Sequence, residues 1–371
     1  MLKFQPFEFH YKIFEGLCRK VLFKMDEEDA HNFVITALKN ETVKDFIPNF
    51  KINFSNLNSN VFGMEFKNPI GLAAGFDKNA ECMNSLAKFG FGFLEVGTVT
   101  KLPQIGNPKP RIFRLVEDKA IINFLGFNNR GSEFFSENIS HLFEEVENLN
   151  CRLGINIGKN KDSNDGIKDY IDLLEKFYIF SDYITINISS PNTPGLRDMQ
   201  HDSSFDELLE AISNKKQELI KTTKTTKPVL VKISPDNSLE QLELMAEKIL
   251  KYKIDGVIIS NTTIQDRENL NSPKKLDKGG LSGKPLFNRS TTTLREFYKL
   301  TEGKIPLIGA GGVFTAEDAY TKILNGASLV QIYTAFIYQG FSIVKQLNQD
   351  LSYLLQKNGF KNVSEAIGKG I

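Results

Sequence analysis

Polar side chains gather where an apolar run of this sequence ends. The stretch YITINISSPNTPGLR (183–197) starts with alternating isoleucines and then breaks into hydroxyls, amides and prolines. A serine nucleophile at Ser190 would need a neighbouring base, usually histidine. The chain has four histidines, none of them at the end of an apolar run: His10, His31, His141 and His201. Hydrolase chemistry is therefore weakly supported, and Ser190 alone is more typical of a turn hydroxyl.

Two lysines stand where a charge is costly. Lys78 (GFDKN) and Lys232 (VLVKISP) lie on or just past apolar runs, where an unpaired ammonium group is unfavourable. Such a lysine usually meets a carboxylate, a phosphate or a ring that becomes anionic on reduction. An ion pair with an internal Asp or Glu explains each lysine equally well, so both interpretations stay open.

Glycines near the end of the chain indicate a phosphate site. GAGG (309–312) and YTA (333–335) end the last two apolar runs, and glycine lets a phosphate approach backbone N–H groups. Tight turns that need glycine are the alternative. Phe314 stands where a dinucleotide fingerprint needs its third glycine, and GGLSGKP lacks the spacing of a P-loop. The pattern favours a mononucleotide cofactor or a phosphorylated substrate.

Asparagines accompany these groups. Each amide offers two donors and an acceptor, which suits the amide edge of a planar heterocycle. Because the chain is rich in Asn throughout, a few such positions are expected by chance. Five asparagines map to the face where the barrel predicted below would carry its active site: Asn123, Asn156, Asn187, Asn192 and Asn261.

A repeated sequence pattern predicts the strands and helices that position these residues. From residue 68, apolar β-branched runs alternate with segments of helical spacing, which indicates a parallel sheet covered by helices. Eight such units predict a closed (β/α)8 TIM barrel, with its active site at the carboxyl ends of the strands; an open doubly wound sheet is the alternative. The predicted strands are 68–75, 91–100, 153–160, 183–192, 228–235, 255–263, 305–312 and 329–336.

Two segments fall outside the repeat. Residues 101–152 are too long for a minimal connection, which predicts a functional insertion. Residues 1–50 form a small N-terminal two-helix domain in this interpretation, and residues 51–371 form the barrel. The two-helix segment is either a simple cap or an apolar docking surface. Its apolar positions follow helical spacing at Phe7, Tyr11, Phe14, Leu17 and Val21, and again at Ala30, Phe33, Val34, Ala37 and Leu38.

Composition narrows the class of protein. The 371 residues are 41% hydrophobic with a net charge of +1, which is typical of a globular chain and gives no general attraction for nucleic acid. No apolar run reaches the ~18 residues of a membrane span, so any membrane contact is expected at the surface. The start resembles neither a signal peptide nor a transit peptide. Cys18, Cys82 and Cys151 lack metal or redox spacing, so we expect no metal site and a reducing compartment.

Together, the motifs resemble the dihydroorotate dehydrogenase family, specifically its membrane-associated, quinone-dependent class, over essentially the full length. Ten motifs in order make the resemblance specific. They are NPIGLAAGFDKN, EVGTVT, GNPKPRIFRL, INFLGFNN, GINIGKNK, INISSPNTPGLR, VKISPD, IISNTT, GGLSGKPL and the segment from IGAGGV to GASLVQIYTA.

The resemblance implies FMN-dependent oxidation of dihydroorotate to orotate in pyrimidine synthesis, with a quinone as electron acceptor. The flavin contacts that it implies are Ala74, Gly75, Lys78, Thr98, Asn156, Asn187, Lys232, Ser260, Gly283, Gly312, Tyr333 and Thr334. The implied substrate contacts are Lys78, Asn123, Phe124, Leu125, Gly126, Phe127, Asn187, Asn192, Asn261 and Thr262.

The resemblance also implies catalytic roles. Soluble relatives carry cysteine where this chain has Ser190. In this chain, Ser190 would remove a proton from C5 of the substrate while a hydride leaves C6 for the flavin. Thr193 would help the proton to leave, and Phe127 would shield the site. Lys232 would stabilise negative charge on the reduced flavin, and Lys78 would hold the substrate carboxylate.

For the acceptor, the family resemblance implies a quinone site between the N-terminal helices, with His31 and Arg114 as its polar residues. A helix-surface histidine is the alternative for His31. We expect a monomeric peripheral membrane protein, on the cytoplasmic face of a bacterial inner membrane because a transit peptide is missing. Phe124 and Ser260 depart from the residues usual in the family, and Phe124 could alter the wall of the substrate loop.

Overall fold

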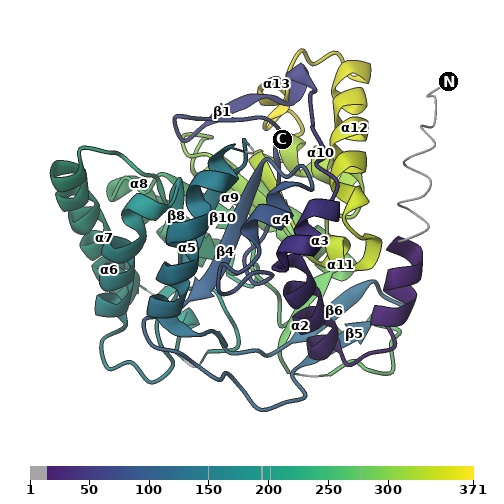
Figure 1. The fold of residues 1–371 in the computed structure, drawn as a ribbon. Coiled ribbons are helices and arrows are strands. Elements are labelled where there is room, and N and C mark those ends of the chain that lie inside the picture. The colour runs from purple at the N-terminus through teal and green to yellow at the C-terminus, as the bar shows by residue number, and fades with distance from the viewer. Residues whose placement is uncertain (1–14, 149, 194, 201, 277) are drawn as a thin grey trace.

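The computed structural model describes residues 15–148, 150–193, 195–200, 202–276 and 278–371, and its centre is a closed barrel of eight parallel strands (Figure 1). Each predicted strand overlaps one barrel strand, so the prediction of a closed (β/α)8 barrel is confirmed. The strands lie in chain order, and β13 pairs with β3 to close the ring. They are β3 (Ile70–Leu72), β4 (Phe93–Val99), β7 (Arg152–Ile157), β8 (Tyr183–Asn187), β9 (Val229–Ile233), β10 (Gly256–Ile259), β12 (Leu307–Ala310) and β13 (Ala327–Ile332).

Amphipathic helices cover the outside of the barrel. Their starts are encoded locally: Ser238 and Gln241 form a capping box at α8, and Thr315 and Asp318 form one at α10. The covering helices are α4 (Met83–Ala87), α5 (Gly131–Asn148), α6 (Gly166–Phe177), α7 (Asp202–Thr223), α8 (Leu239–Lys251), α9 (Phe287–Leu300), α10 (Ala316–Leu324) and α12 (Ser342–Lys357).

Aromatic rings fill one end of the barrel interior. A Cβ on Gly71 would lie 2.4 Å from the Phe93 ring, and one on Gly154 would lie 2.1 Å from the Tyr183 ring. These glycines therefore make room for two large side chains that pack with Phe66. The hairpin of β1 (Ser59–Val61) and β2 (Met64–Phe66) carries Phe66 into this cluster. The filled end leaves the other end of the barrel to carry a site.

The insertion at residues 101–152 builds a second sheet beside the barrel. Its β5 (Ile112–Leu115) and β6 (Ala120–Asn123) pair antiparallel, and β6 also pairs with β11 (Gly280–Gly283). The sequence predicted an insertion but not these strands. Each has only four residues, and the partner of β6 comes from a segment about 160 positions away in the chain, so no local pattern reveals the pairing.

The N-terminal segment lies against this second sheet (Figure 1). Residues 15–22 are helical, followed by α2 (Glu27–Leu38) and α3 (Glu41–Phe46). The helix predicted from the second apolar stripe is confirmed as α2. The earlier positions Phe7, Tyr11 and Phe14 lie outside the described residues.

Candidate active site

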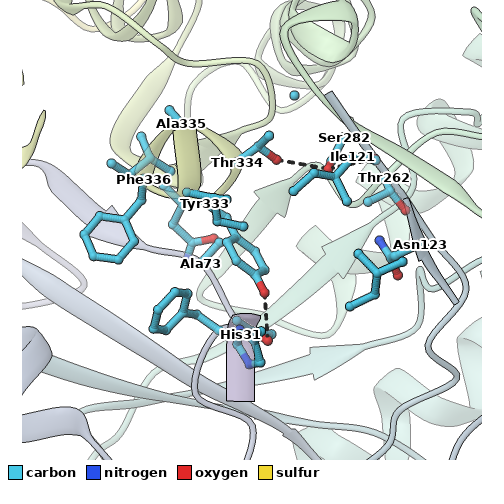
Figure 2. Close-up of a pocket in the computed structure, with 18 of the residues that line it drawn as sticks. His31, Ala73, Ile121, Asn123, Thr262, Ser282, Tyr333, Thr334, Ala335 and Phe336 are labelled. Carbon is cyan, nitrogen blue, oxygen red and sulfur yellow. Dashed lines mark hydrogen bonds between the residues drawn. The ribbon is translucent and has the colours of Figure 1, made fainter. Parts of the chain in front are cut away.

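One cavity of about 410 Å³ lies at the carboxyl ends of the barrel strands. Its wall continues from β8 and β9, past the second sheet, to the N-terminal helices and to α11 (Thr334–Gln339). Figure 2 shows His31 of α2, Asn123 of β6 and Tyr333, which follows β13, around one space. The polar strand ends and the apolar helical segment therefore share a single cavity.

An amide network lies under the polar end of the cavity. The Thr98 hydroxyl donates to Asn156 Oδ1 at 2.5 Å. Asn187 Nδ2 donates to the same Oδ1 at 3.0 Å and lies 3.1 Å from Thr98 Oγ1. These bonds fix the orientation of three side chains from β4, β7 and β8, and Thr98 and Asn187 face the cavity.

Glu95 is a buried carboxylate beneath this network. It accepts hydrogen bonds from Asn156 Nδ2 at 2.8 Å, Gln331 Nε2 at 2.9 Å and Thr185 Oγ1 at 3.2 Å. Its Oε1 also lies 3.7 Å from Lys232 Nζ. The ion-pair interpretation of Lys232 therefore holds, and the lysine still lines the cavity from above.

Lys78 behaves differently from Lys232. Within the part of the chain that the structure describes, no carboxylate lies within ion-pair distance of its ammonium group, which faces the cavity. Burial lowers the pKa of Lys78 from 10.5 to about 8; the charge of Glu28 opposes this shift and that of Arg111 adds to it. An anion in the cavity would supply the missing partner.

The loop after β8 carries Ser190 to the edge of the cavity. Ser190 is buried, and its Oγ accepts a hydrogen bond from the backbone N–H of Asn192 at 3.2 Å. The Asn192 side chain donates to Asn123 Oδ1 at 3.1 Å, which joins this loop to β6. The hydroxyl oxygens of Thr193 and Thr262 are buried and have no hydrogen-bond partner among the described residues. A buried hydroxyl without a partner normally indicates that a water or a ligand group supplies the missing hydrogen bond.

Glycines line the other side of the cavity. Gly311 and Gly312 have φ values of +101° and +79°, and a Cβ on Gly312 would lie 2.4 Å from the Phe287 Cα. The positive φ values and the close approach of Phe287 require glycine there, so this part of the cavity wall is backbone without side chains. Nearby, the Thr334 hydroxyl donates to Ser282 Oγ at 3.0 Å, which Figure 2 marks with a dashed line.

The apolar end of the cavity carries two polar side chains. The His31 ring packs edge-on to Phe76, with centroids 5.4 Å apart. Burial and the nearby charge of Lys78 lower the pKa of His31 to about 3, so this imidazole is neutral. Arg114 Nη1 donates to the Phe23 carbonyl at 3.3 Å, and its guanidinium lies 4.3 Å from the centre of the Phe23 ring.

Most of the residues singled out in the sequence line this one cavity. They are His31, Ala74, Gly75, Lys78, Thr98, Arg114, Asn123, Leu125, Gly126, Phe127, Asn187, Ser190, Asn192, Lys232, Ser260, Asn261, Thr262, Gly283, Gly312, Tyr333 and Thr334.

Three others lie off the cavity wall. Asn156 belongs to the network under the wall, and Thr193 is buried within the loop after β8. The Phe124 ring stacks on Phe113 at 5.9 Å. The Phe124 side chain therefore packs on the second sheet, and only its neighbours in the chain reach the cavity.

Sequence reasoning missed two groups that hold this site together. Glu95 had a signal, since a carboxylate inside the apolar run FLEVGTV is as costly as a lysine in such a run. Arg197 ends the SSPNTPGLR motif, and its guanidinium donates to the carbonyls of Ser189 at 3.1 Å and Thr262 at 3.0 Å. It also donates to Asp236 at 2.9 Å. Arg197 thus joins the loop that carries Ser190 to the loop that carries Asn261.

The described residues contain neither a metal-binding cluster nor a membrane-spanning helix. No group of three or more His, Cys, Asp or Glu side chains could hold a metal ion there. None of the helices described is long and apolar enough to cross a membrane.

Comparison with known proteins gives consistent matches. The family model described as dihydroorotate dehydrogenase matches residues 56–355. A protein of Brucella anthropi named dihydroorotate dehydrogenase (quinone) is 45% identical over 353 residues, covering 95% of this chain and 94% of its own. A mitochondrial protein of Oryza sativa subsp. japonica with the same name is 44% identical over 366 residues, covering 93% and 77%.

Solved structures agree with these matches. The crystal structure of DHODH in complex with ferulenol from Eimeria tenella superposes with a TM-score of 0.87 at 39% identity, covering 92% of this chain and 95% of that one. A ligand-free structure from the same organism has the same TM-score and identity. Both the sequence and the fold therefore place this chain among oxidoreductases: it belongs to the dihydroorotate dehydrogenase family, in the group whose members are named quinone-dependent.

Proposed function

We propose that this protein oxidises dihydroorotate to orotate with FMN as its cofactor, and that a membrane quinone takes the electrons. The reaction would serve pyrimidine (UMP) biosynthesis. One observation carries the proposal beyond family membership: a single cavity joins Ser190 and its asparagine neighbours to an apolar pocket at His31. A substrate and a lipophilic acceptor can thus approach opposite ends of one flavin.

The residues present fit an FMN group. The side-chain-free backbone at Gly311 and Gly312, with the Thr334 hydroxyl nearby, suits a phosphate. The amides of Asn187 and the cation of Lys232 suit the polar edge of an isoalloxazine ring, whose negative charge after reduction Lys232 would stabilise. When bound, the flavin supplies a two-electron acceptor for hydride.

The substrate would lie beside Ser190. The Lys78 ammonium, which has no ion-pair partner in the described chain, would bind the substrate carboxylate. Asn123, Asn192 and Asn261 line the same region and would read the amide edge of the pyrimidine ring.

Proton removal would fall to Ser190. Its Oγ would take the proton from C5 of the substrate as the serine's own hydroxyl proton passes to Thr193 Oγ1, and Thr193 would release its hydroxyl proton to a water and so to solvent. A serine is a weak base, so the reaction needs such an exit route for the proton. Phe127 lines the cavity here and would keep bulk water away.

The N-terminal helices would bind the acceptor and the membrane surface. Large apolar side chains are exposed on them: Leu17, Val21, Phe33 and Phe46 are 58%, 64%, 59% and 80% exposed. Apolar side chains on short helices suit the interface of a bilayer, which supports a peripheral membrane protein. As its location we propose the cytoplasmic face of a bacterial inner membrane. We also propose that the protein is active as a monomer.

Flavin spectroscopy and an acceptor series test the function. We expect purified protein to show flavin absorbance that dihydroorotate bleaches without oxygen. In steady state, a quinone should support turnover far better than fumarate or NAD⁺. A colourless protein, or flavin that dihydroorotate does not reduce, would contradict the proposed reaction; a preference for fumarate or NAD⁺ would contradict only the acceptor.

A further inference from the structure

Glu28 of α2 is a buried carboxylate that the proposed acceptor site does not use. It is 8% exposed and points from the N-terminal segment toward the second sheet. Its two oxygens accept from Arg111 Nη2 at 2.7 Å and Arg111 Nε at 3.0 Å. Lys109 adds a weaker contact at 3.4 Å. A bidentate pair of this kind fixes both partners in orientation.

Arg111 extends this contact to the loops over the substrate end. Its Nη1 donates to the carbonyls of Ile105 at 2.6 Å and Asn107 at 2.8 Å. The Asn107 side chain then donates to the carbonyls of Phe124 at 2.8 Å and Asn192 at 3.3 Å. Three successive hydrogen-bonded contacts, through Arg111 and Asn107, therefore connect helix α2 to the backbone next to Asn123 and near Ser190.

Glu28 also acts on Lys78 by its charge. The ionisable groups around Lys78 are Glu28 and His31 on α2, Arg111 before β5, and Asp77 in the same loop as the lysine. Burial is the main cause that lowers the Lys78 pKa to about 8. Of the charges, Glu28 has the largest effect and favours the ammonium form, whereas Arg111 disfavours it.

We propose that Glu28 is a positioning residue of the substrate site: with Arg111 it anchors the loops that carry Asn123 and Asn192, and its negative charge keeps the Lys78 ammonium available. Helix α2 would then serve both ends of the cavity, the acceptor end through His31 and the substrate end through Glu28. This inference rests on the proposed function, because it needs an anionic substrate at Lys78.

The pH dependence of orotate binding separates this role from a structural one. Flavin-loaded protein is titrated calorimetrically with orotate between pH 6 and 9.5. Wild-type affinity should fall above about pH 8, where Lys78 loses its proton. In Glu28→Gln the fall should begin about one pH unit lower, because a charge that favours the ammonium is gone. Loss of the anchor should also weaken binding roughly tenfold at pH 6.5.

Three further variants sharpen the test. Glu28→Asp keeps the charge and should restore the pH at which affinity falls. Glu28→Gln with Arg111→Gln removes two opposed charges, so the fall should return toward that of the wild type while affinity at pH 6.5 stays low. Asp29→Asn removes a charge from the neighbouring, exposed position of α2 and should match the wild type throughout.

The outcomes distinguish the two levels of the proposal. If dihydroorotate does not reduce the flavin of the wild type, the proposed function fails. If it does, and Glu28→Gln binds orotate like the wild type at every pH, the role of Glu28 is wrong. A double variant whose affinity falls at the same pH as in Glu28→Gln would overturn the charge effect, and an Asp29→Asn variant with the same shift would overturn the assignment to Glu28.

Discussion

Lys232 and Glu95 form an ion pair at the base of the active site, with 3.7 Å between Nζ and Oε1. Both side chains are nearly or fully buried, and Glu95 has further donors in Asn156, Thr185 and Gln331. A buried pair seldom stabilises a fold by itself, but a single partner left alone is costly. The buried carboxylate of Glu95 therefore holds the Lys232 ammonium, which lines the cavity, in place at the base of the site.

Replacement of Glu95 by Gln should destabilise the protein by about 3–5 kcal/mol, because Lys232 loses its anion while several donors lose an acceptor. Urea unfolding of the flavin-loaded protein measures this free energy. The double variant Glu95→Gln, Lys232→Met removes both charges and should recover part of the loss. Equal stability of Glu95→Gln and the wild type would contradict the ion pair.

Replacement of Ser190 by Ala should slow flavin reduction by dihydroorotate about 10²- to 10⁴-fold, because the proposed base is lost. Flavin content should not change, since the proposed cofactor contacts do not include Ser190. Stopped-flow absorbance measures the rate, and released flavin is measured separately. Reduction at the wild-type rate would rule out Ser190 as the base.

Replacement of Arg197 by Met should lower kcat/KM for dihydroorotate about tenfold or more, because two active-site loops lose a common donor. Arg197→Lys should not restore the activity, since one ammonium group cannot reproduce the planar set of donors. Arg289→Met is the matched control: Arg289 also lies near Asp236, but its hydrogen bonds go to Asp266. Equal losses in Arg197→Met and Arg289→Met would point to general destabilisation.

The sequence predicted what depends on local pattern. Strand β9 was predicted from its apolar run, VLVKI, and the lysine inside that run indicated a charge in the interior. The same reasoning applies to Glu95 in β4, so the pair at the base of the site was within reach of the sequence. The place of Asn187 and Ser190 at the site was predictable as well, because barrels carry their active sites at the carboxyl ends of their strands.

Contacts between distant segments could not be predicted in this way. Glu28 and Arg111 are 83 positions apart, and each alone is an ordinary surface-type residue. The pairing of β6 with β11 likewise joins segments without a shared local pattern. A family motif also does not fix the direction of every side chain within it. Phe124 belongs to the motif assigned to the substrate, but its ring packs on Phe113 and not on the cavity.

Replacement of His31 by Ala should impair quinone reduction and leave flavin reduction by dihydroorotate within about twofold of the wild type, since His31 lies at the apolar end of the cavity. Separate stopped-flow measurements of the two half-reactions check this. Deletion of residues 1–50 is a less selective change, because it also removes Glu28 and should impair both half-reactions. Equal losses in both half-reactions of His31→Ala would contradict an acceptor-side role.

The pH dependence of the acceptor step provides a last test of His31. A histidine in water titrates near pH 6.5, but burial and the charge of Lys78 lower the pKa of His31 to about 3. Because a lowered pKa keeps the imidazole neutral from pH 5 to 8, it can donate or accept one hydrogen bond to a quinone but cannot supply a positive charge. The rate of quinone reduction should therefore show no ionisation of His31 in this range, and His31→Gln, which keeps a neutral donor and acceptor, should retain more activity than His31→Ala. A break near pH 6–7 that disappears in His31→Gln would mean that the imidazole titrates normally and that the cavity around it is open to water.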